Sequence, residues 1–98
     1  MVEEFSQLKA TMKDKPYLQQ SLELANNIFG EDALYSAKYH FLLGYLSQSS
    51  SQTEEAYNHY NDCLKIISNK EFANEFLKKK NTSNIILLKN KLSSLKLR

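Results

Sequence analysis

The sequence is poor in the residues that make disulfides, sharp turns and membrane spans. Its 98 residues include one cysteine, one proline, two glycines and no tryptophan. A single cysteine excludes an internal disulfide and a cysteine-rich zinc site, so a reducing compartment is the default expectation. The chain starts with acidic residues instead of a basic leader, and no apolar run approaches the ~18 residues of a membrane span. We therefore expect a soluble, cytoplasmic protein.

The scarcity of glycine and proline also bears on the fold class. Few strand-ending turns are available, and no useful length of sequence alternates apolar and polar residues with the period of two that strands show. A chain of this length suits one small domain that buries about two-thirds of its unfolded surface. We predict a single all-α domain over residues 1–98.

Charge is distributed unevenly along the chain. Residues 69–98 carry eight Lys or Arg against two Glu, a local charge of +6, which leaves −4 for residues 1–68 out of the total of +2. Such asymmetry indicates that the two parts of the chain meet different surroundings.

Residues 36–67 are the most informative stretch, because they predict two antiparallel helices joined by a polar loop. Residues 37–46 are apolar on almost every side, so this helix must be covered on more than one face. The Ser- and Gln-rich residues 47–52 break the helix, since their side chains compete for backbone hydrogen bonds. Thr53 then supplies a capping hydroxyl ahead of Glu54 and Glu55, which favour the positive end of the next helix.

Within this hairpin, Leu43 and Gly44 are followed by Ala56, Tyr60 and Cys63. This spacing resembles the tetratricopeptide repeat, in which small residues let two helices cross closely and an aromatic ring fills the space beside them. The preceding residues 22–32 look like the longer repeats of kinesin-light-chain type, so that the resemblance covers residues 16–68. It implies antiparallel hairpins in a right-handed stack of about five to six helices.

The sequence departs from the repeat pattern at three positions. His40 stands where the motif prefers a large aromatic residue, Ser47 where it prefers tyrosine, and Ser68 where proline often falls. Residues 36–68 are nevertheless the best match to one repeat. We expect the basic residues 69–98 to cap the stack, with docking on a partner protein as the alternative.

Apolar periodicity predicts further helices on both sides of the hairpin. We expect a short helix over 2–13 and a second from Pro16 to Phe29 that buries Tyr17 or Leu18, Leu22, Ala25 and Phe29, with Leu24 and Ile28 beside them. After a kink near Ser68 and Asn69, a fifth helix should end at Lys78, Lys79 and Lys80. A turn at residues 81–83 should precede a last helix over 82–96.

The tetratricopeptide resemblance implies a concave groove lined by the first helix of the pair. Carried over to this sequence, the groove residues are Lys38, Phe41, Tyr45 and Gln48. The alternative is that helices 2–13 and 82–96 fold over this face and bury it. The basic clamp that some family members use for acidic chaperone tails is absent, because Phe41, Leu42 and Tyr45 occupy its positions.

Candidates for catalysis or metal binding have simpler structural explanations. His40, His59 and Cys63 could bind zinc together only if all three converged, and packing in the hairpin explains His40 and Cys63. Asp32, Glu54, Glu55 and Asp62 lack the apolar surroundings that separate the pKa values of an acid and a base. No phosphate-binding loop or nucleophile motif occurs. We expect no enzyme activity, cofactor or metal.

Two function classes follow. The first is a protein-interaction module or small scaffold subunit that binds a peptide or helix of another protein, with self-association or assembly into a larger complex also compatible. The alternative is an adaptor that contacts a membrane or nucleic acid through basic C-terminal residues. We expect neither ligand, and the lack of interleaved arginine and aromatic residues disfavours nucleic acid in particular. The basic residues of the adaptor are Lys70, Lys78, Lys79, Lys80, Lys89, Lys91, Lys96 and Arg98.

Overall fold

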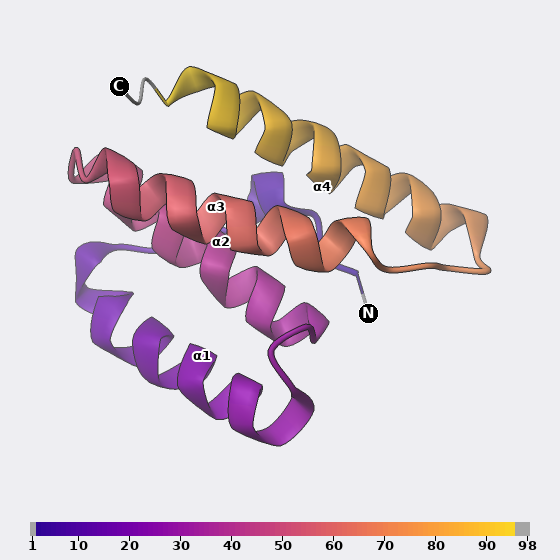
Figure 1. Cartoon of the computed structure of the whole chain (residues 1–98), viewed down its shortest axis with the longest axis horizontal. Coiled ribbons are helices and arrows are strands. Elements are labelled where there is room, and N and C mark those ends of the chain that lie inside the picture. The colour runs from indigo at the N-terminus through magenta and orange to yellow at the C-terminus, as the bar shows by residue number, and fades with distance from the viewer. Residues whose placement is uncertain (1, 96–98) are drawn as a thin grey trace.

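The computed structural model describes residues 2–95, and all the regular structure in them is helical, which confirms the all-α prediction. Each α-helix packs on the next along the chain, with α2 between α1 and α3, and α4 against α3 (Figure 1). The elements are two short 3-10 helices, η1 (Phe5–Gln7) and η2 (Met12–Asp14), and four α-helices, α1 (Lys15–Phe29), α2 (Leu34–Ser49), α3 (Thr53–Ser68) and α4 (Glu75–Ser94).

The helix boundaries follow from local chemistry. Pro16 lies in the first turn of α1, where its missing N–H costs no hydrogen bond, and Gly30 ends that helix with a φ of +95° that favours glycine. Thr53 is the first residue of α3, but its side chain makes no capping hydrogen bond, contrary to expectation. Asn74 caps α4, because its Oδ1 accepts hydrogen bonds from the backbone N–H groups of Phe76 and Leu77 at 2.8 and 3.3 Å.

The crossing of α2 and α3 is as close as the spacing of small residues predicted. A Cβ atom on Gly44 would lie only 2.7 Å from Cδ1 of Tyr60, and Ala56, Tyr60 and Cys63 have no exposed surface. The ring of Tyr60 packs near Phe41 with centroids 5.8 Å apart. Gly44 therefore lets an aromatic ring occupy the space between the two helices.

The expected helix over residues 2–13 is wrong. Only η1 and η2 form there, and the segment between them is extended. Asn84 of α4 explains this, because its Oδ1 accepts from the backbone N–H of Phe5 at 2.9 Å and its Nδ2 donates to the carbonyl of Glu3 at 2.7 Å. The segment thus hydrogen-bonds to a helix 79 residues away in sequence, which replaces bonds that a local helix would make.

The two helices expected after residue 70 are one. α4 runs without interruption from Glu75 to Ser94, and the predicted turn at residues 81–83 lies inside it. The side chain of Asn81 is directed to the backbone of α3, since its Nδ2 donates to the carbonyl of Ile67 at 2.9 Å. The described chain therefore has four α-helices instead of the predicted five to six.

Two further observations concern the C-terminal part. No helix within residues 2–95 combines the length and the apolar character that crossing a membrane requires. The expected end of the last helix at Lys96, and the charges of Lys96 and Arg98, lie outside the described residues.

Candidate functional site

The predicted groove is largely filled by the chain itself. Phe41 is only 3% exposed, and Phe5 of the N-terminal segment stacks on its ring with centroids 5.0 Å apart. A partner cannot reach Phe41 while Phe5 is in place. The rival expectation of burial within the chain holds for this residue, although the cover comes from Phe5 in the short 3-10 helix η1 and not from a helix over 2–13.

The other three predicted residues are partly exposed and have partners inside the chain. Lys38 forms an ion pair with Glu3 at 3.0 Å, and Gln48 accepts a hydrogen bond from the hydroxyl of Tyr60 at 2.8 Å. The ammonium group of Lys91 lies 5.8 Å from the centre of the Tyr45 ring. These contacts orient the three side chains within the fold. The role of Lys38, Tyr45 and Gln48 in partner binding stays a prediction.

Another apolar surface lies along α1 and the start of α2. We call it the α1 apolar face. Each of its five main side chains is more than half exposed, and three of them, at positions 17, 24 and 28, repeat at helical spacing. Its members are Tyr17, Leu24, Ile28, Phe29 and Tyr35.

The turn between α1 and α2 holds the two aromatic members of this face together. The rings of Phe29 and Tyr35 stack with centroids 4.8 Å apart. Ser36, which is fully buried, fixes the turn by donating to Oδ1 of Asn26 at 2.6 Å. Beside the pair, a hollow of about 290 Å³ is lined by Ser21, Leu24, Ala25, Ile28, Phe29, Tyr35 and Tyr39.

The sequence contained a signal for this face. Leu18 and Ala25 are buried against the bundle, as expected, but Phe29 was predicted to be buried and is exposed. Apolar residues occupy two adjacent stripes of α1, one through positions 18, 22 and 25 and another through 17, 24 and 28. One neighbouring helix covers only one of these stripes.

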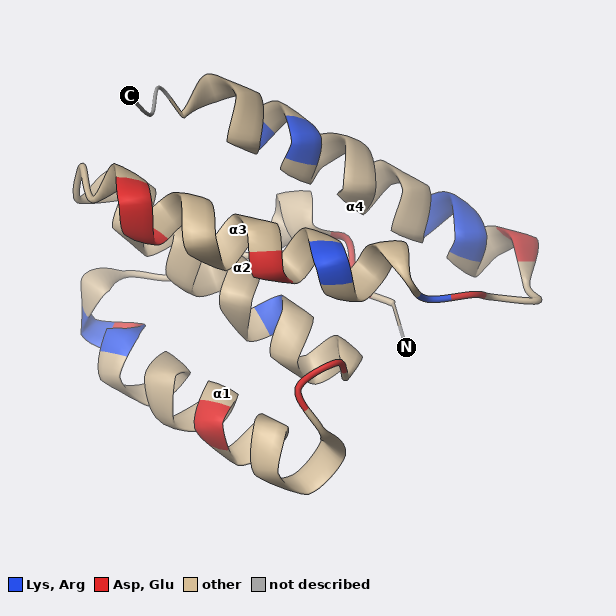
Figure 2. Cartoon of the chain, viewed as in Figure 1, with Lys and Arg blue, Asp and Glu red and all other residues tan. Residues whose placement is uncertain are grey.

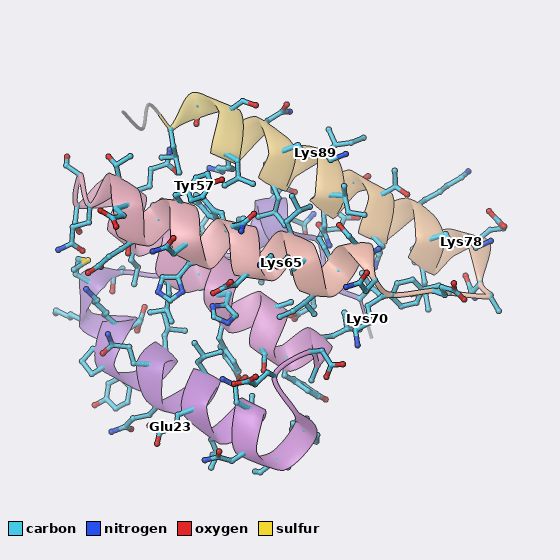
Figure 3. All side chains as sticks on the ribbon, viewed as in Figure 1. Glu23, Tyr57, Lys65, Lys70, Lys78 and Lys89 are labelled. Carbon is cyan, nitrogen blue, oxygen red and sulfur yellow. The ribbon has the colours of Figure 1, made fainter. Side chains whose placement is uncertain are left out.

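Three acidic residues adjoin members of the α1 apolar face in the sequence and form what we call its acidic border. Glu23 lies on the side of α1 that faces away from α2 (Figure 3), and Glu31 and Asp32 follow directly in the turn (Figure 2). All three are exposed, and none forms an ion pair with another residue of the described chain. Such a border favours a partner with basic residues.

The lysines of α4 are less available than their number indicates. Lys78 pairs with Glu75 at 3.4 Å, and the ammonium group of Lys80 lies 4.7 Å from the centre of the Phe76 ring. Lys79 and Lys89 are exposed, and Lys89 projects from the outer side of the helix (Figure 3). Fewer lysines of α4 are therefore available to a ligand than the sequence indicated, and binding to phosphates stays a prediction.

His40 and His59 form the main titratable contact. Their Nδ1 atoms are 3.0 Å apart across α2 and α3. Burial lowers the pKa of both; at His40 the charge of His59 lowers it further, whereas Asp62 opposes the shift at both rings. One neutral ring can then donate to the other, a contact that links the two helices.

The remaining candidates for chemistry are not assembled into a site. Cys63 is completely buried, and burial raises the pKa of its thiol far above the usual range, so the thiolate needed for nucleophilic attack does not form at neutral pH. No group of three or more His, Cys, Asp or Glu side chains in residues 2–95 is placed to hold a metal ion.

Comparison with known proteins supplies no family. No family model matches the chain, and no curated protein and no solved structure matches it either.

Proposed function

We propose that this chain is a non-catalytic protein-interaction module of tetratricopeptide-like architecture, and that its α1 apolar face binds an amphipathic helix of a partner protein. The observation that carries the proposal is the exposure of five large apolar side chains on α1 and the start of α2, four of which line one hollow. Soluble monomers rarely expose extended apolar patches without a binding role.

The shape of the face supports a helical ligand. The exposed positions 17, 24 and 28 are seven and four residues apart, so they follow one side of α1, as the anchors of a helix that lies along another helix do. A partner helix there would pack on α1 much as α1 packs on α2. It would extend the stack of helices by one, which is how helical repeats bury their apolar faces.

The ends of the stack differ in chemistry. The acidic border formed by Glu23, Glu31 and Asp32 favours lysine or arginine beside the apolar anchors of the partner. At the other end, α4 presents a mostly polar outer surface, with Ile86 and Phe76 as its exposed large apolar residues. α4 fits the role of a solubilising cap, as terminal repeats require.

Phe29 and Tyr35 are the anchors that we expect to contribute most to affinity. They are aromatic, stacked on each other and held by a buried serine at the turn. Truncation of an aromatic anchor of this kind at an interface costs about 2 kcal/mol or more.

A peptide selection tests the proposal. Helical peptides selected from a random library against the full chain should carry apolar residues at i, i+4 and i+7 flanked by Lys or Arg. Ile28→Asp should weaken their binding by about 30-fold or more, the equivalent of about 2 kcal/mol. Ile86→Asp on α4 is the matched control, because Ile28 and Ile86 are similarly exposed, at 62% and 55%. Equal weakening by both substitutions, or selection of acidic peptides, would contradict the assignment.

A further inference from the structure

Helices α1 and α4 are the two ends of the stack of helices (Figure 1). The ends differ, because the outer side of α4 is mostly polar whereas α1 exposes Tyr17, Leu24 and Ile28. A stack with one apolar end needs a further layer at that end and none at the other. Two copies of the chain that meet through α1 satisfy this condition, since both outer ends of the combined stack are then α4.

The charges at the two ends of α1 are the reverse of those that its own helix dipole favours. Its first turn contains no acidic residue and its last turn no basic residue. Lysines stand at the start, at positions 13 and 15, and Glu31 and Asp32 follow the end. Asp14 lies between the lysines, but its carboxylate accepts hydrogen bonds from the backbone N–H and the hydroxyl of Thr11. An antiparallel helix of the same sequence would offset this arrangement, because it brings an acidic end to each basic end.

The exposed residues of α1 are also arranged for pairing with a second copy of the same helix. In an interface with twofold symmetry, a contact from residue i to residue j of the partner is repeated from j to i. Antiparallel pairing centred between positions 22 and 23 places Tyr17 opposite Ile28, because the two are equally far from that centre. The same centre places Leu24 opposite Ser21, a small residue that lines the hollow on α1. The exposed leucine of each copy thus meets the hollow of the other, as a knob meets a hole.

One pair of opposite charges follows the same symmetry. Lys13 lies four residues before Tyr17 and Asp32 lies four residues after Ile28, so the pairing also places position 13 opposite position 32. Both charged residues are exposed, and neither forms an ion pair with another residue of the described chain. The twofold axis makes this contact twice in each dimer. Parallel pairing would instead bring lysine to lysine and aspartate to aspartate.

We propose that the helix bound by the α1 apolar face is α1 of a second copy of this chain, in an antiparallel pair with twofold symmetry. The inference rests on the proposed function, since it names the occupant of the same face. Helix α1 meets the description of that ligand, because it carries apolar residues on one side and Lys13 one turn before them. The dimer is closed, since each copy uses its one apolar end and the outer sides of α4 end the stack.

Sedimentation equilibrium of the full chain tests for the dimer. The dimer fraction should rise between about 10 μM and 1 mM at low salt, as for a small transient interface. Lys13→Glu places glutamate opposite Asp32, and Asp32→Lys places lysine opposite Lys13, so each variant replaces two attractions by two repulsions. Each should weaken dimerisation about tenfold, the combined effect of two exposed pairs whose sign is reversed, and added salt should reduce this difference.

A mixture of the two variants tests the symmetry. In a mixed dimer of Lys13→Glu with Asp32→Lys, both contacts again join opposite charges, so an equal mixture should recover the wild-type affinity. Lys89→Glu is the matched control, because it reverses an exposed lysine on the outer side of α4, and it should leave dimerisation unchanged (Figure 3).

The inference and the proposed function fail separately. A wild-type chain that stays monomeric at millimolar concentration overturns self-pairing, while selected peptides can still bind the α1 apolar face. Equal weakening by Lys89→Glu and Lys13→Glu, a mixture that does not recover affinity, or oligomers larger than the dimer would also overturn the inference. Peptide binding that Ile28→Asp leaves unchanged contradicts the proposed function instead, and the inference with it.

Discussion

Replacing Gly44 with alanine should destabilise the protein, although alanine is the better helix former. Within a helix, alanine is more favourable than glycine by about 1 kcal/mol of helix propensity. The new Cβ, however, would lie 2.7 and 2.8 Å from Cδ1 and Cε1 of the Tyr60 ring, and 3.3 Å from Cβ of His59. That ring cannot move aside easily, because it is fully buried, packs near Phe41 and donates its hydroxyl hydrogen to Gln48.

Overpacking of this kind costs about 1–3 kcal/mol, and contact with a fixed ring places Gly44→Ala in the upper half of that range. When the gain in helix propensity is subtracted from this cost, we expect the free energy of unfolding to fall by about 1–2 kcal/mol. In a domain of this size the melting temperature should fall by about 5–10 °C, measured by circular dichroism. Tyr60→Leu should relieve the clash, so the double variant should lose less stability than the sum of the two single variants. A melting temperature raised by Gly44→Ala would refute the close crossing of α2 and α3.

Three other outcomes can be measured on the isolated chain. Asn84→Ala should lower the free energy of unfolding by about 1–3 kcal/mol in urea titrations, and should speed hydrogen exchange at the amide of Phe5, because that buried donor loses its acceptor. Since burial holds the pKa values of His40 and His59 below their ordinary value of 6.5, the unfolded chain binds more protons in mild acid. Stability should therefore be complete above about pH 7 and fall as the pH drops towards 5, and His59→Gln should flatten this slope; a flat profile in the wild type would contradict the buried pair. Cys63 should react with a thiol reagent only after unfolding, and rapid alkylation of the native protein would show that α3 does not bury it.

The hairpin was predictable because its signals are local. Local patterns placed three helices within three residues of their observed ends; the largest error is at α2, which continues to Ser49 through the first half of the expected loop. The spacing of Gly44, Ala56 and Tyr60 identified a close contact between α2 and α3. Pro16 and Gly30 mark helix ends through their own backbone preferences, whatever the rest of the chain does.

The errors concern residues whose conformation depends on distant contacts. The apolar stripe of residues 2–13 resembles a helix, but Phe5 is buried against Phe41 and its backbone bonds to Asn84. Likewise, Asn81 looked like part of a turn between helices, whereas its amide bonds to the backbone of α3 from inside a continuous helix. A polar residue that serves a tertiary contact has the same local pattern as one that ends a helix.

The candidate site was predictable only in part. The sequence indicated that one helix, α2, is too apolar to be covered by a single neighbouring helix, and we therefore expected it to bind a partner. In the structure, the chain itself covers the apolar sides of α2. The unpartnered surface is on α1, where Leu24 and Ile28 were expected to lie beside the core. Which of two apolar stripes on α1 meets α2 depends on the rotation of that helix in the bundle, and the sequence pattern alone does not determine it.

The location of partner binding is tested most directly by nuclear magnetic resonance of the isotopically labelled chain titrated with a selected helical peptide. We predict that the amide shifts that change most belong to residues 17–35, centred on Ile28, Phe29 and Tyr35. Changes centred instead on Tyr45 and Gln48 would return the contact to the groove implied by the tetratricopeptide resemblance. Such a result, or changes confined to α4, would contradict the assignment of the α1 apolar face.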